Sequence, residues 1–142
     1  MTDVVSLAAE LLALDSSTGA ESSAVDFVSK WLVARGWNVT LQEVTRERAN
    51  VWASRKGRGV TLSTHLDTVL PYISPRRDGD RLMGRGACDA KGIAAAMLAA
   101  SDELAQAGEE RVDLLGTRRL LQSSFQIRSA SSRCPDSRAR ST

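Results

Sequence analysis

The stretch that decides the fold runs from Val60 to Gly92: VTLSTHLDTVLPYISPRRDGDRLMGRGACDAKG. Its apolar opening, Val60 to Leu62, predicts a buried strand. His65-Leu66-Asp67 stands at the end of that strand, and Gly84-x-Gly86-x-x-Asp89 stands directly before an Ala-rich helical segment. Ligands of open α/β sheets bind beyond the carboxyl ends of the strands. This order of elements therefore predicts a metal site at that edge of the sheet.

His65 is the single histidine of the chain, and its neutral imidazole suits zinc or a similar divalent metal. Asp67 lies two residues further on, so both side chains point the same way from an extended backbone. A carboxylate there suits the outer-shell partner that accepts the second ring N–H of a metal-bound histidine. The alternative is a histidine at a strand end that is bonded to backbone, and the pair alone leaves both interpretations open.

The glycine-rich segment favours a ligand site. Gly84 and Gly86 permit backbone angles that bring Asp89 close to a ligand, and Asp89 is then either a helix N-cap or a carboxylate held for a metal. Two phosphate-binding motifs are excluded. The dinucleotide fingerprint needs a glycine where Asp89 stands, and a phosphate-binding loop needs Gly-Lys-Ser/Thr where this chain has Lys91-Gly92-Ile93.

Ser63–Val69 and Gly84–Gly92 resemble the two N-terminal signatures of the two-metal aminoacylase and carboxypeptidase family. That family includes acetylornithine deacetylase, succinyl-diaminopimelate desuccinylase, carboxypeptidase G and peptidase T. The resemblance covers residues 3 to 115, and the Asp-Gly-Asp-Arg-Leu spacer at 78–82 between the signatures adds to its specificity.

The resemblance implies a three-layer α/β catalytic domain of the zinc-exopeptidase type. It implies that His65 binds one metal, that Asp89 bridges two zinc or cobalt ions, and that Asp67 acts in catalysis by orienting His65. The peptide bond after Asp89 is often cis in the family. Cys88 stands at a position that varies among relatives and is not counted as a ligand. The implied activity is hydrolysis of amide bonds in N-acylated amino acids or small peptides.

The remaining elements follow from periodicity and from turn-forming residues. We expect an α/β layer structure with its helices packed on a mixed sheet. Ser22 or Ser23 is the expected cap of the second helix, and Lys56–Gly59 is expected to be a hairpin-like turn. The predicted helices are 3–14, 22–35 and 91–107, and the predicted strands are 37–44, 50–54, 60–62 and a strand beginning at 112–115.

Composition limits the classes of protein. No apolar run approaches the roughly 18 residues of a membrane span, and the Met1-Thr2-Asp3 start lacks the basic residues of a signal peptide, so a cytoplasmic protein is expected. The two cysteines imply no disulfide framework. Residues 1–115 hold 13 basic and 16 acidic side chains, and residues 116–142 hold 6 and 1. The basic character therefore belongs to the last residues, and no nucleic-acid partner is inferred.

The family pattern breaks near Gly116. In relatives the strand at Val112 leads to Gly-Glu-Glu, whose first Glu is the general base and whose second is a metal ligand, but this chain continues Gly116-Thr117-Arg118. Glu109-Glu110 precedes the strand and is not taken for that pair. The later ligands are also absent from the sequence. We expect residues 1–115 to be the N-terminal part of a metallohydrolase domain and 116–142 to be a disordered Ser/Arg-rich tail. Our hypothesis for the abrupt switch is a frame change or a gene truncation near Gly116.

Three interpretations remain. The first is a metallohydrolase of acylated amino acids or peptides. The second is a non-catalytic remnant of that lineage, which we expect of this polypeptide alone, with weak binding of zinc or cobalt. The third is an interaction module whose basic tail binds an acidic partner. We also expect marginal stability or self-association through an edge strand at Val112.

Overall fold

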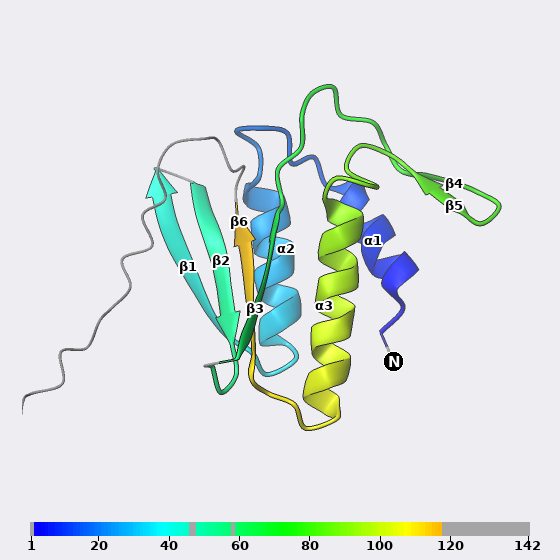
Figure 1. The fold of residues 1–142 in the computed structure, drawn as a ribbon. Coiled ribbons are helices and arrows are strands. Elements are labelled where there is room, and N and C mark those ends of the chain that lie inside the picture. The colour runs from blue at the N-terminus through cyan, green and yellow to red at the C-terminus, as the bar shows by residue number, and fades with distance from the viewer. Residues whose placement is uncertain (1, 46–47, 58, 118–142) are drawn as a thin grey trace, which may run out of the picture.

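The computed structural model describes residues 2–45, 48–57 and 59–117. Helices predicted from the sequence are present, with ends that differ by no more than two residues (Figure 1). The described elements, in chain order, are α1 (Val4–Ala13), α2 (Ser22–Val33), β1 (Asn38–Thr45), β2 (Arg48–Ser54), β3 (Val60–His65), β4 (Arg76–Asp78), β5 (Arg81–Met83), α3 (Lys91–Gln106) and β6 (Val112–Thr117).

Four strands form a mixed sheet in the order β1-β2-β6-β3. β1 and β6 are each antiparallel to β2, while β3 is parallel to β6, with Val60 opposite Val112 and His65 opposite Thr117. α2 packs on β1 and β2, α3 packs on β3, and α1 packs on α3 (Figure 1). The mixed α/β architecture expected from the sequence is confirmed.

The core lies between the sheet and the helices because each element turns its apolar side inward. Along β2 the buried residues alternate, with Val51 and Ala53 inside and Trp52 between them half-buried. Small alanines on α3 allow its backbone to approach α1 closely. The helical part of the core comprises Leu7, Ala8 and Leu11 of α1, Ala24, Val25, Val28 and Leu32 of α2, and Ala94, Ala95, Leu98 and Ala105 of α3.

The position of β6 corrects two predictions. β6 lies between β2 and β3, so Lys56–Gly59 does not form a hairpin turn, because the strands on its two sides are not paired with each other. The strand at Val112 is an interior strand and not an edge strand, and Val112, Asp113 and Leu114 are all buried there. Pairing between residues distant in sequence decided the strand order, and local periodicity carries no information about it.

A third correction concerns burial of β3. The strand forms where predicted, but Val60 at its start is 65% exposed, because β3 has a neighbour on only one side within the described residues. Leu62 is half-buried and packs against the core. Among the described elements, therefore, β3 and β1 are the edge strands of the larger sheet.

The segment between β3 and α3 contains two short strands that the sequence analysis did not predict. β4 and β5 form a two-stranded antiparallel sheet, and Gly79 at φ 57° lies in the turn between them. The predicted serine cap of α2 is wrong. Glu21 is the N-cap residue and makes no side-chain capping bond, while the Ser23 hydroxyl donates to the Asp15 carbonyl.

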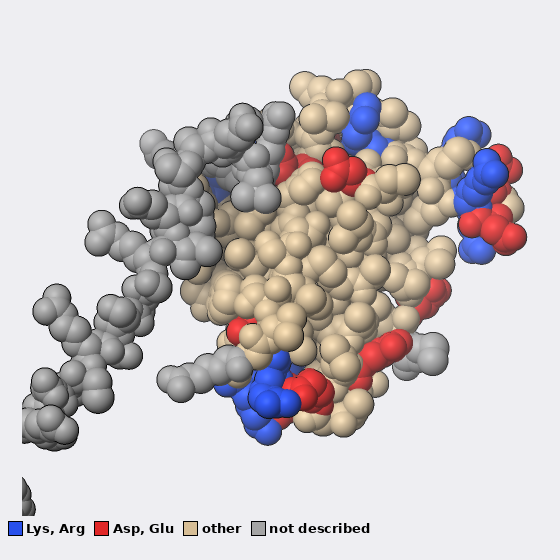
Figure 2. Space-filling model, in the orientation of Figure 1, with Lys and Arg blue, Asp and Glu red and all other residues tan. Residues whose placement is uncertain are grey.

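Charged side chains gather in separate areas of the surface. Figure 2 shows them on the β4–β5 hairpin, at the upper end and at the lower end of the molecule, with a broad uncharged area in the middle of this face. No helix in the described part of the chain is long and apolar enough to cross a membrane. The tail predicted at 116–142 falls outside the described residues from 118 onward, and its boundary near Gly116 stays a prediction.

Candidate functional site

Three residues picked out by the sequence converge at the carboxyl end of β3. His65 ends that strand, Asp67 follows it, and Asp89 stands in the loop that leads into α3. His65 Nε2 lies 2.9 Å from Asp89 Oδ1, although the two residues are 24 positions apart. On the other side of the ring, Nδ1 lies 3.2 Å from Asp67 Oδ1 and 2.9 Å from the Asp67 carbonyl oxygen. The predicted convergence is confirmed.

The geometry bears on the alternatives left open by the sequence. Asp89 is not an N-cap, because the N-cap position of α3 is Ala90 and no side chain caps it. The backbone alternative for His65 holds in part, since Nδ1 contacts both the carbonyl and the carboxylate of Asp67. The Asp89–Ala90 peptide bond is cis, as the family resemblance implied.

Exposure rises from one side of the site to the other. The side chain of Asp67 is 3% exposed, that of His65 is 29% exposed, and that of Asp89 is 83% exposed. These residues line a pocket of about 520 Å³ together with Arg85 and Cys88. Arg85 Nε donates to the Pro71 carbonyl at 2.9 Å. The Nε2 side of His65 therefore faces an accessible hollow, while the Nδ1 side is fixed against buried groups.

Opposing effects act on the protonation of His65. Burial lowers the pKa of His65, but the hydrogen bond to Asp89, the bond to the Asp67 carbonyl and the charges of both carboxylates together outweigh it, so the pKa is raised. Two acceptors face Nδ1, which assigns a proton to that nitrogen. Nε2 then shares either a proton or a cation with Asp89.

A divalent metal fits between His65 and Asp89. Zinc bonds of about 2.1 Å at a tetrahedral angle separate two ligand atoms by about 3.4 Å, so the 2.9 Å gap needs to open by only a few tenths of an ångström. Within residues 2–45, 48–57 and 59–117, no group of three or more His, Cys, Asp or Glu side chains is placed to hold a metal. The described residues thus fit a metal as a pair of ligands, with Asp67 behind the histidine.

A further contact set supports the site, and the sequence analysis missed it. Lys91 is fully buried, and its Nζ donates to the Leu14 carbonyl at the end of α1. Burial lowers the pKa of Lys91, and the charge of Asp15 opposes that effect. A sequence signal existed, because Lys91 shares the helical spacing of Ala94, Ala95 and Leu98 and therefore lies on the apolar face of α3.

Glycines bring the two halves of the site together. Gly86 has φ 90°, and a Cβ there would lie 3.0 Å from the Thr68 methyl and 3.2 Å from the Lys91 stem. Its carbonyl accepts from Lys91 N at 2.9 Å. At Gly92 a Cβ would lie 2.1 Å from the Ala87 carbonyl oxygen, so no larger residue fits the loop as it stands. Both close approaches place Asp89 beside the strand that carries His65.

Glu109 and Glu110 lie at the opposite end of the sheet. They precede β6, which runs parallel to β3, whereas His65 stands at the end of β3. Glu109 Oε2 pairs with Arg111 at 2.9 Å, and Glu110 pairs with Arg55 and with Lys56. The expectation that this acidic pair does not belong to the site agrees with its location.

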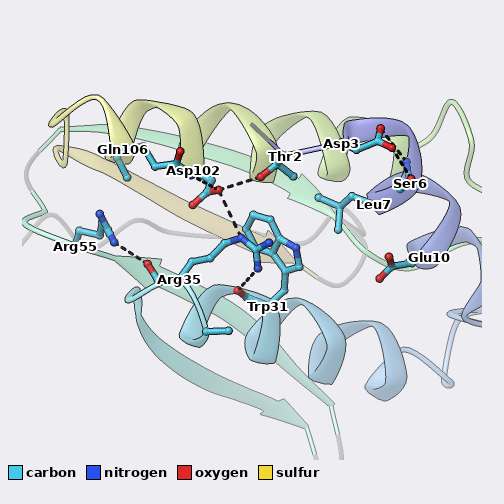
Figure 3. A pocket seen from close by; sticks show the side chains of 12 residues that line it. Thr2, Asp3, Ser6, Leu7, Glu10, Trp31, Arg35, Arg55, Asp102 and Gln106 are labelled. Atoms are coloured by element: carbon cyan, nitrogen blue, oxygen red, sulfur yellow. Dashed lines mark hydrogen bonds and ion pairs between the residues drawn. The ribbon is translucent and has the colours of Figure 1, made fainter.

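A second pocket, larger than that of the site, lies elsewhere in the described part of the chain. It has a volume of about 750 Å³ and is lined by residues from the start of α1, the end of α2 and the second half of α3 (Figure 3). Arg35 stacks on Trp31 at 3.7 Å and pairs with Asp102 at 3.5 Å, and Arg55 donates to the Arg35 carbonyl at 2.6 Å. Arg35 and Asp102 of this pocket are thus already paired with each other, and size alone does not make it the candidate site.

Comparisons with known proteins agree with the signatures. Residues 61–118 match the model of peptidase family M20/M25/M40. The chain is 36% identical over 113 residues to a Peptidase M20 domain-containing protein of Schizosaccharomyces pombe, covering 75% of this chain and 28% of the relative. It is 38% identical over 96 residues to a putative LysW-lysine/LysW-ornithine hydrolase of Pyrococcus abyssi, covering 66% and 27%.

A solved structure supports the fold. The M20 family metallo-carboxypeptidase Sso-CP2 of Sulfolobus solfataricus superimposes with a TM-score of 0.68 at 21% identity, covering 82% of this chain and 31% of that one. At that identity the likeness concerns the fold alone. The chain spans between a quarter and a third of the length of these relatives. The matched signatures, the sheet that carries them and the shared fold together show that the chain belongs to peptidase family M20/M25/M40.

Proposed function

We propose that His65, Asp67 and Asp89 form part of the metal site of a hydrolase that cleaves amide bonds in N-acylated amino acids or small peptides. The observation that carries the proposal is the 2.9 Å contact between His65 Nε2 and Asp89 Oδ1 at the carboxyl end of β3. Relatives named as carboxypeptidases and as LysW-lysine hydrolases support an amide bond as the target. Zinc or cobalt is the proposed metal, with two ions in the complete family site.

Each residue has a separate task in this proposal. His65 offers Nε2 and Asp89 offers a carboxylate oxygen to the metal, and the exposure of Asp89 leaves its second oxygen accessible to a second ion. Asp67 accepts from Nδ1–H and fixes the ring, as outer-shell carboxylates do. A divalent metal bound there supplies Lewis acidity toward water and toward the amide carbonyl.

The 142-residue chain by itself is proposed to turn over substrate near background. A general base must lie within hydrogen-bond reach of the water that it activates. No Glu follows Glu110 in the sequence, and Glu109 and Glu110 are paired with cations at the far end of the sheet. Catalytic zinc also needs about three protein ligands, and the described residues offer two.

Metal titration by calorimetry tests the site. Zinc and cobalt should bind weakly to the purified chain, and His65→Ala should abolish that binding. Glu109→Gln is the matched control, because it removes a carboxylate from the opposite end of the sheet and should leave the affinity unchanged. Equal zinc affinity in the wild type and in His65→Ala would overturn the assignment of the site.

Hydrolysis of N-acetyl and N-succinyl amino acids tests the activity. Rates near those of buffer are expected for this chain, with or without added zinc. Turnover well above background that a chelator abolishes would show that this chain does supply a general base.

The self-association expected from the sequence is now proposed for β3. This strand is at the edge of the sheet within the described residues, and Val60 is 65% exposed beside the half-exposed Leu104. An unpaired strand edge with apolar side chains is a template for pairing with a second copy. Sedimentation should show mass increasing with concentration, and Val60→Lys should reduce that increase. A concentration-independent monomer would contradict this self-association.

The cytoplasmic location expected from the sequence stays a prediction.

A further inference from the structure

We propose that the connector segment between α1 and α2, Leu14–Thr18, is the positioning element of the metal site, because it binds both halves of the site at once. This inference rests on the proposed function, since it concerns the same site. Ser16 and Lys91 are not among the proposed metal ligands, but they set the separation of His65 and Asp89.

The first set of contacts holds the half of the site that contains His65 and Asp67. The Ser16 hydroxyl is fully buried and donates to the Leu66 carbonyl at 2.7 Å, in the residue between His65 and Asp67. Thr68 N donates to the Ser16 carbonyl at 2.8 Å, and Thr18 N donates to the Thr68 carbonyl at 3.1 Å. The connector therefore runs as a short parallel bridge alongside the chain that follows β3.

The second contact holds the half that contains Asp89. Lys91 stands two residues after Asp89 and is fully buried, and its ammonium group donates to the carbonyl of Leu14. A buried ammonium needs a hydrogen-bonded partner, so this bond strongly fixes where the first turn of α3 lies. Leu14 and Ser16 are only two residues apart. The two halves of the site are therefore hydrogen-bonded to the same short piece of backbone.

Asp15 shapes that piece of backbone. Its Oδ1 accepts from Ser17 N at 2.9 Å and from the Ser17 hydroxyl at 2.6 Å, which holds the connector in a turn. The Asp15 residue itself is exposed, so it can be replaced without opening space in the core. The connector thus offers one buried position, Ser16, and one exposed position, Asp15, at which its role can be tested, and Lys91 offers a third position on α3.

The test uses His65 as its own reporter, because it is the single histidine and its ring nitrogen signals are unambiguous in ¹⁵N NMR. In the metal-free wild type, Asp89→Asn should move the His65 Nε2 signal, since it replaces the carboxylate 2.9 Å away. In Ser16→Ala and in Lys91→Met, the same Asp89→Asn change should move that signal far less. Asp15→Ala should act in the same direction and more weakly.

Matched controls separate positioning from general loosening. Ser29→Ala removes a similar serine-to-carbonyl bond of 2.7 Å within α2, and Lys30→Met removes a lysine charge from the same helix. Both should leave the response of His65 to Asp89→Asn intact. Ser16→Thr, which keeps the hydroxyl, should restore it. An unchanged response in the connector variants, or its loss in the α2 controls as well, would overturn the inference.

A zinc titration of the same variants distinguishes this inference from the proposed function. Zinc affinity should fall about 10- to 100-fold in Ser16→Ala and Lys91→Met, the range for residues that orient metal ligands. If zinc does not bind His65 in any variant but the NMR coupling is lost as described, the proposed function fails and the connector inference stands. If zinc binds His65 equally in all of them, the connector inference fails and the metal site stands.

Discussion

The two ends of the sheet both carry paired carboxylates, and they differ in what those carboxylates contact. At the amino end of β6, Glu109 and Glu110 pair with the cations of Arg111, Arg55 and Lys56. At the carboxyl end of β3, Asp67 and Asp89 contact the two nitrogens of one imidazole. A guanidinium keeps its protons at every ordinary pH, whereas an imidazole nitrogen can exchange its proton for a metal.

The difference shows why residue type alone does not locate a catalytic carboxylate. Arg111 holds the pKa of Glu109 at about 2 through hydrogen bonds from its side chain and backbone. Glu109 is therefore ionised but already bound to a guanidinium group. Asp89 is 83% exposed, and it contacts an imidazole nitrogen of His65 that can exchange its proton for a metal. Of the two ends of the sheet, the carboxyl end is therefore suited to metal binding.

The largest expected effect is a loss of folding stability from a substitution at the end of the sheet where β3 and β6 begin. A Cβ at Gly59 would lie 1.4 Å from the Arg111 carbonyl oxygen, so Gly59→Ala must displace the backbone at the start of β3 or the start of β6. We expect a loss of about 3 kcal/mol or more in the free energy of unfolding, at the upper end for overpacking. Urea denaturation measures it.

Gly108→Ala is the comparison for that change. Gly108 has φ 89° but nothing within 4 Å of an added Cβ, so only backbone strain of about 1 kcal/mol is expected. Equal losses in the two variants would show that the close approach at Gly59 is relieved easily.

A smaller effect is expected from the carboxyl end, and it concerns metal binding. Asp67→Asn keeps the shape of a side chain that is 3% exposed but removes the charge facing His65 Nδ1. Zinc affinity should fall about 10- to 100-fold, or about 1.4 to 2.8 kcal/mol. Glu110→Gln, which alters an ion pair at the other end, should leave the affinity unchanged in the same calorimetric titration. A zinc affinity that Asp67→Asn leaves unchanged would show that Asp67 does not orient His65 for metal binding.

The smallest effect is the pH dependence contributed by Glu109. Its pKa falls from an ordinary 4.5 to about 2 in the folded chain, chiefly through hydrogen bonds from Arg111. A depressed folded-state pKa adds stability that is present above pH 4.5 and is lost as pH falls toward 2. Urea midpoints of the wild type and Glu109→Gln should therefore differ slightly at pH 6 and converge near pH 2. A difference that grows on acidification would contradict this sign.

The helices and the site residues could be predicted from the sequence because their signals are local. Periodicity located α1, α2 and α3 to within two residues, and the family signatures placed His65 and Asp89 at one edge. The metal-binding roles of those residues stay predictions. The burial of Lys91 was not predicted because lysine is ordinarily an exposed residue. Its helical spacing with Ala94, Ala95 and Leu98 nevertheless put it on the buried face.

The strand order could not be predicted because it depends on distant pairings. Nothing near Lys56–Gly59 indicates that β6 inserts between β2 and β3. The burial of Asp113 inside β6 and the exposure of Val60 at the start of β3 are both reversed from what hydrophobicity suggests. The burial of each residue follows from the place of its strand in the sheet, which depends on the strands that lie on either side.

The interior position of β6 has a consequence for the order of events during synthesis on the ribosome. β1 and β2 can pair as soon as both emerge, since they are consecutive and antiparallel. β3 emerges next, but its partner in the described sheet is β6, and Val60 cannot meet Val112 until α3 has also been translated. The nascent chain therefore holds His65 on a strand that lacks its described partner while residues 66 to 117 are translated, and β3 can join the sheet only when residues up to Thr117 have left the exit tunnel.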